Sequence, residues 1–210
     1  MEMKKMRIIG VNGSPNAEGN TFLTIKAFLN EIRKEGFETD ILHAGDGRVP
    51  GCIGCRKCAE KGECAVPDAL FSEMSEKLLA ADGVFLAAPV YFGSMPGQMM
   101  SFLDRFFFVS LKRSLMRLKV GASAAILRRT GGYTTIDDLN RYILAGDMVM
   151  VGQCIIHGEM PGEVLQDIEG LAAIRRLARN MAWVLKMKNA TAGSIDLPLY
   201  EKRPMMNFIR

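Results

Sequence analysis

The chain has no long apolar run, no signal-peptide pattern and no dense stripe of one charge. A helix that crosses a membrane needs about 20 consecutive apolar residues, and no such run occurs. The lysines near Met1 are not followed by an apolar stretch with a small-residue cleavage site. These absences argue against a membrane protein and predict a cytoplasmic location.

The net charge of +4 is modest, and the basic residues are scattered along the sequence. A protein that binds nucleic acid would be expected to show a denser basic stripe with interleaved aromatic residues. Nucleic acid is therefore not expected as a partner. Most basic residues are interpreted as solvated helix faces; examples are Lys112, Arg113, Arg117, Lys119, Arg128 and Arg129.

The chain does contain enough apolar residues for one packed domain. It has 210 residues, of which 49% are hydrophobic and 24% charged, a composition typical of globular proteins. Neither internal repeats nor low-complexity linkers are visible. We expect one domain over residues 1–188, with a cysteine-rich loop at 50–68, followed by an irregular C-terminal arm over 189–210.

Apolar runs alternate with segments of helical periodicity. Buried parallel strands read as nearly continuous apolar runs, which predicts strands over residues 6–12, 37–43, 83–90, 120–127 and 148–156. Asn20 is expected to cap a helix that ends at Gly36. Further helices are predicted over residues 68–80, 96–112, 135–144 and 169–186.

This alternation predicts the α/β class, with a parallel sheet covered by helices on both faces. Five strands suit a flavodoxin-like three-layer sandwich of strand order 2-1-3-4-5. Such sheets bind ligands beyond the carboxyl ends of the strands, where the strand order reverses. The loops after the first, third and fourth strands are therefore the candidate site.

The loop after the first strand has the character of an anion cradle. It runs from Gly13 to Thr21 and leads directly into a helix, whose free backbone N–H groups and positive dipole end suit a phosphate. The Walker pattern and the dinucleotide fingerprint are both absent, so a monophosphate fits better than a triphosphate. The alternative interpretation is a polar turn and helix cap. Neutral donors come from Ser14, Asn16, Asn20 and Thr21.

Two further loops offer a surface for a flat ligand. Residues 88–97 contribute aromatic and apolar side chains at the mouth of the sheet, with small residues that let the backbone approach a ligand. Residues 128–133 contain Gly131-Gly132 and offer a similar backbone. Each loop alone is weak evidence, because Gly-Gly is usually just a turn. Together with the first loop they predict one site.

These residues resemble the NADPH-dependent FMN reductase family, and within it the iron-sulfur flavoprotein branch. The resemblance covers about residues 6–187 and rests on Gly13-Ser14-Pro15 with Asn20-Thr21, on residues 89–97, and on Leu103-Asp104-Arg105. It implies bound FMN, with the phosphate on Ser14, Asn16, Asn20 and Thr21. It also implies that the flavin ring is held by Pro89, Val90, Tyr91, Phe92, Gly93, Thr130, Gly131 and Gly132.

Four cysteines lie in the loop after the second strand, with spacing C-x2-C-x2-C-x5-C. They are Cys52, Cys55, Cys58 and Cys64. Four closely spaced thiols in a cytoplasmic protein suggest metal rather than disulfides. A [4Fe–4S] cluster, zinc and an empty set of thiols all remain open, although paired zinc ligands are usually set further apart. The resemblance implies the cluster.

Two functions follow from the resemblance. The first is an FMN-dependent oxidoreductase that takes a hydride from NAD(P)H and reduces a flavin, a quinone or another small acceptor. The second is an electron carrier that uses FMN and the cluster with ferredoxin-like partners. No acid–base catalyst is assigned, because flavin chemistry belongs largely to the cofactor. Cys154 is expected in the core and His43 and His157 at the rim, and a homodimer or homotetramer is predicted.

Overall fold

The molecule is built around one parallel sheet. The structure, a computed structural model, describes residues 5–201. The sheet has the order β2-β1-β3-β4-β5, as predicted for a flavodoxin-like fold, and each predicted strand lies within one residue of its expected ends. The strands are β1 (Arg7–Asn12), β2 (Glu38–His43), β3 (Gly83–Pro89), β4 (Val120–Leu127) and β5 (Val149–His157).

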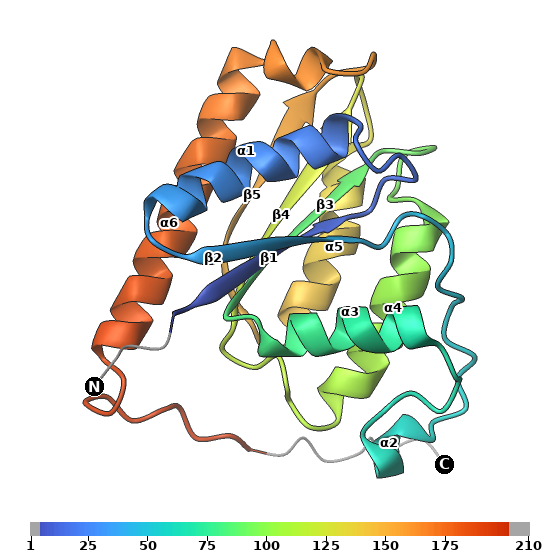
Figure 1. The fold of residues 1–210 in the computed structure, drawn as a ribbon, viewed down its shortest axis with the longest axis vertical. Coiled ribbons are helices and arrows are strands. Elements are labelled where there is room, and N and C mark those ends of the chain that lie inside the picture. Colours follow the sequence, from blue (N-terminus) through green and yellow to red (C-terminus); the bar gives the residue numbers. More distant parts are fainter. Residues whose placement is uncertain (1–4, 202–210) are drawn as a thin grey trace, which may run out of the picture.

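Helices cover both faces of this sheet and give it three layers (Figure 1). Side chains alternate across a strand, so Ile8 belongs to one core and Ile9 to the other. One face carries α1 (Asn20–Lys34) and α6 (Ile168–Ala190); the other carries α3 (Ala69–Ala80), α4 (Gly97–Leu111) and α5 (Gly132–Ala145). The short helices α2 (Cys58–Lys61) and η1 (Glu163–Leu165) lie in connections.

The central strands are buried on both faces, as their sequences require. All eight residues of β4 are buried, and so are the first six of β3. The two cores are dominated by aliphatic and phenylalanine side chains; on one of them Phe28 of α1 stacks on Phe85 of β3 with ring centroids 4.0 Å apart. The outer strands β2 and β5 are partly exposed. Because helices cover both faces of the sheet, the loops at the strand ends form the accessible binding surface.

The start of α1 differs from the prediction that Asn20 caps it. Gly19 occupies the cap position, no side chain caps the helix, and Asn20 is its first residue. The amide of Asn20 is used elsewhere: its Nδ2 donates to the Met160 carbonyl at 3.0 Å, and its Oδ1 accepts from the Gly162 N–H at 2.8 Å. The loop after β5 thus lies against the start of α1, and the Asn20 side chain holds it there instead of capping the helix.

Two other helices are longer than predicted. α5 begins at Gly132, three residues before the expected Thr135, because the Gly131 backbone at φ +86° already turns the chain into the helix. α6 continues to Ala190 rather than ending at residue 186. Beyond it, residues 191–201 form no further helix or strand. The remainder of the predicted arm, 202–210, lies outside the described residues.

After β2 the chain passes directly beneath the loop that follows β1. The ring of His43 contacts the Ser14 carbonyl, with Nε2 and O 2.7 Å apart. A Cβ at Gly45 would lie 2.3 Å from the same oxygen, so only glycine permits this approach. The chain then continues into the cysteine-rich loop. Over residues 5–201 no helix has the length and apolar character needed to span a membrane.

Candidate functional site

The loop between β1 and α1 is held open by its own side chains. Asn12, 1% exposed at the end of β1, accepts from the Ser14 N–H at 3.0 Å. The Ser14 hydroxyl accepts from the Asn16 N–H at 3.1 Å, and the Asn16 side chain accepts from the Glu18 N–H, also at 3.1 Å. These bonds fix the loop ahead of the first turn of α1, which has no side-chain cap and contains no acidic residue. Such an N-terminus attracts anions.

A hollow of about 340 Å³ opens at this loop, and we call it the phosphate-loop hollow. Its walls combine the loop after β1 with the ends of β3 and β4 and with residues 158–161 after β5. Predicted site residues that line it are Ser14, Asn16, Asn20, Pro89, Val90 and Tyr91. Thr21 does not line it, being 2% exposed inside the first turn of α1. The volume suits a small ligand.

The loop after β3 makes a tight turn at the mouth of this hollow. Tyr91 and Ser94 exchange two backbone hydrogen bonds of 2.8 and 3.1 Å, and both residues between them, Phe92 and Gly93, have positive φ. That conformation is unusual for a bulky residue. The Phe92 ring is fully exposed and does not line the hollow. The Ser94 hydroxyl donates to the buried carboxylate of Asp138 on α5, which anchors the turn.

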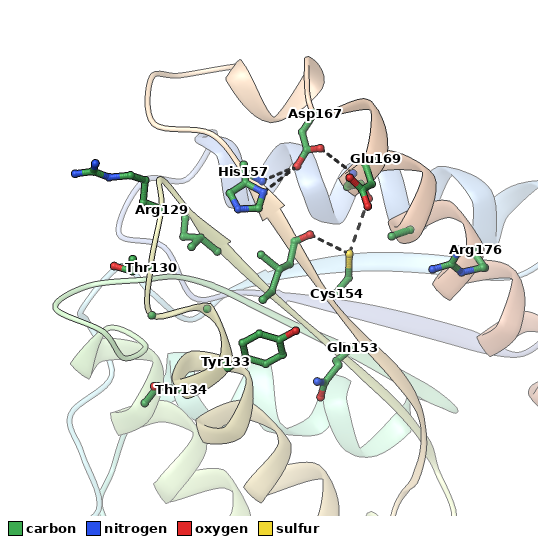
Figure 2. Close-up of a pocket in the computed structure, with 16 residues that line it drawn as sticks. Arg129, Thr130, Tyr133, Thr134, Gln153, Cys154, His157, Asp167, Glu169 and Arg176 are labelled. Carbon is green, nitrogen blue, oxygen red and sulfur yellow. Dashed lines mark hydrogen bonds and ion pairs between the residues drawn. The ribbon is translucent and has the colours of Figure 1, made fainter.

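Gly131 joins this turn to the loop after β4. A Cβ on it would lie 2.8 Å from both the Gly93 Cα and the Val90 Cγ1, so the two loops meet only because residue 131 is glycine. Thr130, Gly131 and Gly132 line a second hollow of about 860 Å³ between the start of α5, β5 and α6 (Figure 2). We call it the edge hollow. It adjoins the phosphate-loop hollow at Leu127.

The edge hollow also contains charged groups beyond the predicted set. The Asp167 carboxylate accepts from the backbone N–H groups of Gly170 and His157 at 2.8 and 2.7 Å. Burial alone would raise the pKa of Asp167, but these bonds and the nearby His157 ring lower it. Figure 2 shows the His157 ring turned toward Asp167, at 3.5 Å. Cys154 is core-facing as predicted, and burial raises its pKa to about 11.

All four cysteines of the cysteine-rich loop line one narrow hollow, which we call the cysteine hollow. Cys52 and Cys55 are exposed, and Cys58 and Cys64 are half-buried. Burial raises the pKa of Cys58, and negative charge on the other three thiols raises it further, as expected for thiols gathered in one place. Within residues 5–201, no three Cys, His, Asp or Glu side chains already converge as metal ligands. The donor set nevertheless fits a thiolate-ligated group.

Arg105 of α4 anchors the end of the cysteine loop. Its guanidinium, 2% exposed, lies 4.1 Å from the Phe71 ring centroid. It donates to the Asp68 carboxylate at 2.7 Å, to the Val66 carbonyl at 2.7 Å and to the Cys64 sulfur at 3.1 Å. Asp68 in turn caps α3 by accepting from the Phe71 N–H at 2.9 Å. One buried cation thus connects α4, the cap of α3 and a cysteine.

Comparison with known proteins identifies the family to which this chain is similar. Residues 6–160 match the family model described as NADPH-dependent FMN reductase. The chain belongs to that family. It is 36% identical over 192 residues to an iron-sulfur flavoprotein of Methanocaldococcus jannaschii, covering 87% of this chain and 98% of the relative. A second iron-sulfur flavoprotein, from Methanosarcina thermophila, is 31% identical over 187 residues and covers 87% and 96%.

These relatives place this FMN reductase family member in the iron-sulfur flavoprotein branch, so the chain is a flavin-dependent oxidoreductase by family. A solved structure of RosB with bound 8-demethyl-8-formylriboflavin-5'-phosphate shares the fold. Its TM-score is 0.73 at 15% identity, over 98% of this chain and 94% of RosB. That likeness concerns the fold alone.

Sequence reasoning missed three residues that the fold brings to the site. Arg128 lines the phosphate-loop hollow and forms an ion pair of 3.0 Å with Glu159, which lines the same hollow from the loop after β5. Asn12 supports the phosphate loop from below. The position of Arg128 directly after a strand was the available signal. Its partner lies on another strand end, which no local pattern reveals.

Proposed function

We propose that the chain binds FMN in the phosphate-loop hollow and transfers electrons from NAD(P)H to a flavin, a quinone or another small acceptor. The observation that carries this proposal is the phosphate-loop hollow, where an uncapped helix N-terminus meets the turn after β3. The uncapped N-terminus of α1 suits a phosphate, and the turn after β3 suits a flat ring system.

Most of the predicted residues have a role in this proposal, whereas Thr21, buried inside the first turn of α1, has none. Ser14, Asn16 and the backbone around Gly19 hold the phosphate, and Arg128, which is ion-paired with Glu159, supplies further N–H donors at the rim. Asn20 acts indirectly, by fixing the loop after β5. The turn from Tyr91 to Ser94 and the backbone of residues 130–132 hold the ring. FMN, when bound, supplies the capacity to accept a hydride and to release electrons singly or in pairs.

A single charge placed in the cradle tests FMN binding. Asn16→Asp keeps the oxygen that accepts from the Glu18 N–H but introduces a negative charge where the phosphate is expected. The Kd for FMN should rise at least tenfold, about 1.4 kcal/mol, while riboflavin, which has no phosphate, is unaffected. The matched control is Asn30→Asp, an exposed position on α1 away from the hollow. Lack of FMN binding by the folded wild type would refute the proposal.

The donor is tested separately. NADH and NADPH, added anaerobically to the FMN-loaded chain, should each be examined for bleaching of the flavin absorption. Bleaching by either within seconds supports the reductase. Reduction by dithionite but by neither nucleotide would overturn NAD(P)H as donor and leave FMN binding intact.

The second candidate function is an electron carrier with FMN and a [4Fe–4S] cluster. It is favoured by the position of Cys52, Cys55, Cys58 and Cys64 around one hollow. When bound there, the cluster would supply single-electron transfer. Anaerobic reconstitution with iron and sulfide should load the wild type and Cys154→Ser equally, whereas Cys55→Ser should lose iron. Equal iron in all three proteins would refute the ligand set, and zinc in the isolated protein would favour the zinc alternative.

A homodimer or homotetramer is part of the proposal. Phe92 is a fully exposed aromatic residue held at positive φ beside the flavin loops, and exposed apolar groups of this kind commonly mark interfaces. Light scattering should give a multiple of the 23.2 kDa chain mass, and Phe92→Ser should weaken assembly. A monomeric mass at micromolar concentration would contradict this expectation.

A further inference from the structure

Each of the three guanidinium nitrogens of Arg105 donates to a different partner. Nη1 donates to the Asp68 carboxylate at 2.7 Å, Nη2 to the Val66 carbonyl at 2.7 Å, and Nε to the Cys64 sulfur at 3.1 Å. The guanidinium is planar and rigid, so the directions of its donors are fixed relative to one another. The two oxygen partners therefore hold the Nε–H in the direction of Cys64.

The four sulfurs of the cysteine loop differ in the donors that reach them. Over residues 5–201, Arg105 is the only side chain that donates a hydrogen bond to any of the four. The Gly54 backbone N–H lies 3.5 Å from the Cys52 sulfur, but that donor is neutral and both residues are exposed. Cys64 is thus distinguished within the set by a charged donor that is itself buried.

A buried cationic donor acts strongly on the sulfur that it contacts. Hydrogen bonds from charged groups are stronger than neutral ones, and a poorly solvated environment strengthens them further. The Phe71 ring, with its centroid 4.1 Å from the guanidinium carbon, covers Arg105 on one side. Reduction of an iron-sulfur cluster increases the negative charge on its sulfurs, so such a donor stabilises the reduced form more than the oxidised form. Hydrogen bonds to the sulfurs and solvent exposure both set cluster potentials.

We propose that Arg105 is a positioning residue that holds Cys64 as a ligand and, through the Nε–H···Sγ hydrogen bond, raises the reduction potential of an iron-sulfur cluster in the cysteine hollow. The inference rests on the electron-carrier form of the proposed function. Reduction adds one electron, which dithionite supplies in a titration; no bond is made or broken, and the proton stays on Nε. A higher potential lets weaker reductants deliver this electron.

Charge-conserving substitutions test this role. The full chain, loaded with FMN and reconstituted anaerobically with iron and sulfide, is titrated with dithionite, and the reduced cluster is followed by electron paramagnetic resonance. Lysine has one nitrogen and cannot replace three separate donors. At the wild-type midpoint, the ratio of reduced to oxidised cluster should therefore fall about threefold or more in Arg105→Lys. The matched control is Arg113→Lys, which should titrate like wild type, because Arg113 donates to the Lys61 carbonyl of the same loop at 3.5 Å rather than to a sulfur.

A second variant should shift the potential in the opposite direction. Asp68→Asn keeps an oxygen for the Phe71 N–H at the start of α3 but removes the negative charge that balances Arg105. The reduced form should therefore be favoured, and the potential should rise. A general loosening of the loop would instead shift the potentials of Arg105→Lys and Asp68→Asn in the same direction. Circular dichroism and iron content are measured for every protein, so that only folded and loaded chains are compared.

A measurement on the wild type applies even if Arg105→Lys fails to fold or to take up iron. With arginine labelled by nitrogen-15 at Nε alone, pulsed electron paramagnetic resonance of the reduced cluster should detect coupling to the label, and Arg113→Lys should retain it. Absence of this coupling, equal potentials in wild type and Arg105→Lys, or shifts of the same sign in both variants would overturn the inference while the electron-carrier function stands. A wild type that takes up no iron would refute the electron-carrier function and this inference together.

Discussion

Replacement of Arg105 by methionine should strongly destabilise the protein, although residue 105 lines neither the phosphate-loop hollow nor the edge hollow. Methionine is similar in length and apolar, so the volume is largely retained. The change removes the donors to the Asp68 carboxylate, the Val66 carbonyl and the Cys64 sulfur. The Asp68 side chain is only 11% exposed, so its charge would be left in a poorly solvated place.

The loss in the free energy of unfolding follows from the burial of Asp68. Removing one partner of a buried ion pair costs about 3–5 kcal/mol, because the other charge is left uncompensated. For a chain of this length, each kcal/mol lowers Tm by about 2–4 °C. The expected loss is therefore about 6–20 °C. Arg33→Met, an exposed control, should change the free energy of unfolding by no more than about 0.5 kcal/mol.

Urea unfolding of the reduced, cofactor-free chain, followed by circular dichroism, measures these differences. Asp68→Asn keeps an oxygen to cap α3 but unpairs Arg105. The double variant should be more stable than the sum of the single losses by at least about 1 kcal/mol, since contacting residues couple. A loss below about 1 kcal/mol for Arg105→Met, or simple additivity, would refute the reasoning.

Three further results are expected. Gly131→Ala should lower stability by about 1–3 kcal/mol and weaken FMN binding, whereas Gly36→Ala, also at positive φ but in open space, should cost only about 1 kcal/mol; equal thermal melts for the two would contradict the close approach. At pH 8, iodoacetamide should label Cys52 and Cys55 before Cys154, whose pKa is raised to about 11 by burial; peptide mass mapping that finds equal labelling would be inconsistent with this. The hydrogen bonds that lower the pKa of Asp167 add stability that is present above the unfolded-state pKa of about 4 and lost as pH falls through the lower folded-state value. The stability gap between wild type and Asp167→Asn should thus hold from pH 7 to 5 and shrink toward pH 3 in urea titrations, and an unchanged gap at pH 3 would count against it.

The sequence was sufficient for the sheet because β3 and β4 are continuous apolar runs that have no other stable environment. The phosphate loop was also recognisable, since its residues are consecutive. The use of the Asn20 amide was not, because its partners Met160 and Gly162 are about 140 residues away. The same reason applies to the grouping of Lys112, Arg113 and Arg117 with Lys188. In the sequence each of these residues looks like an ordinary solvated cation, because Lys188 is about 70 residues away from the other three and only the fold brings it beside them.

The cysteine loop follows β2, so members of this branch can vary it without disturbing the rest of the sheet. β2 is an edge strand paired only with β1, and the flavin-side loops follow β1, β3 and β4. Insertions or deletions after an edge strand leave the register of the remaining sheet unchanged. A relative can therefore lengthen, shorten or lose its thiols while retaining the same flavin cradle. Changes in the cysteine loop and changes in the loops after β1, β3 and β4 are thus separable during evolution, and also in protein engineering.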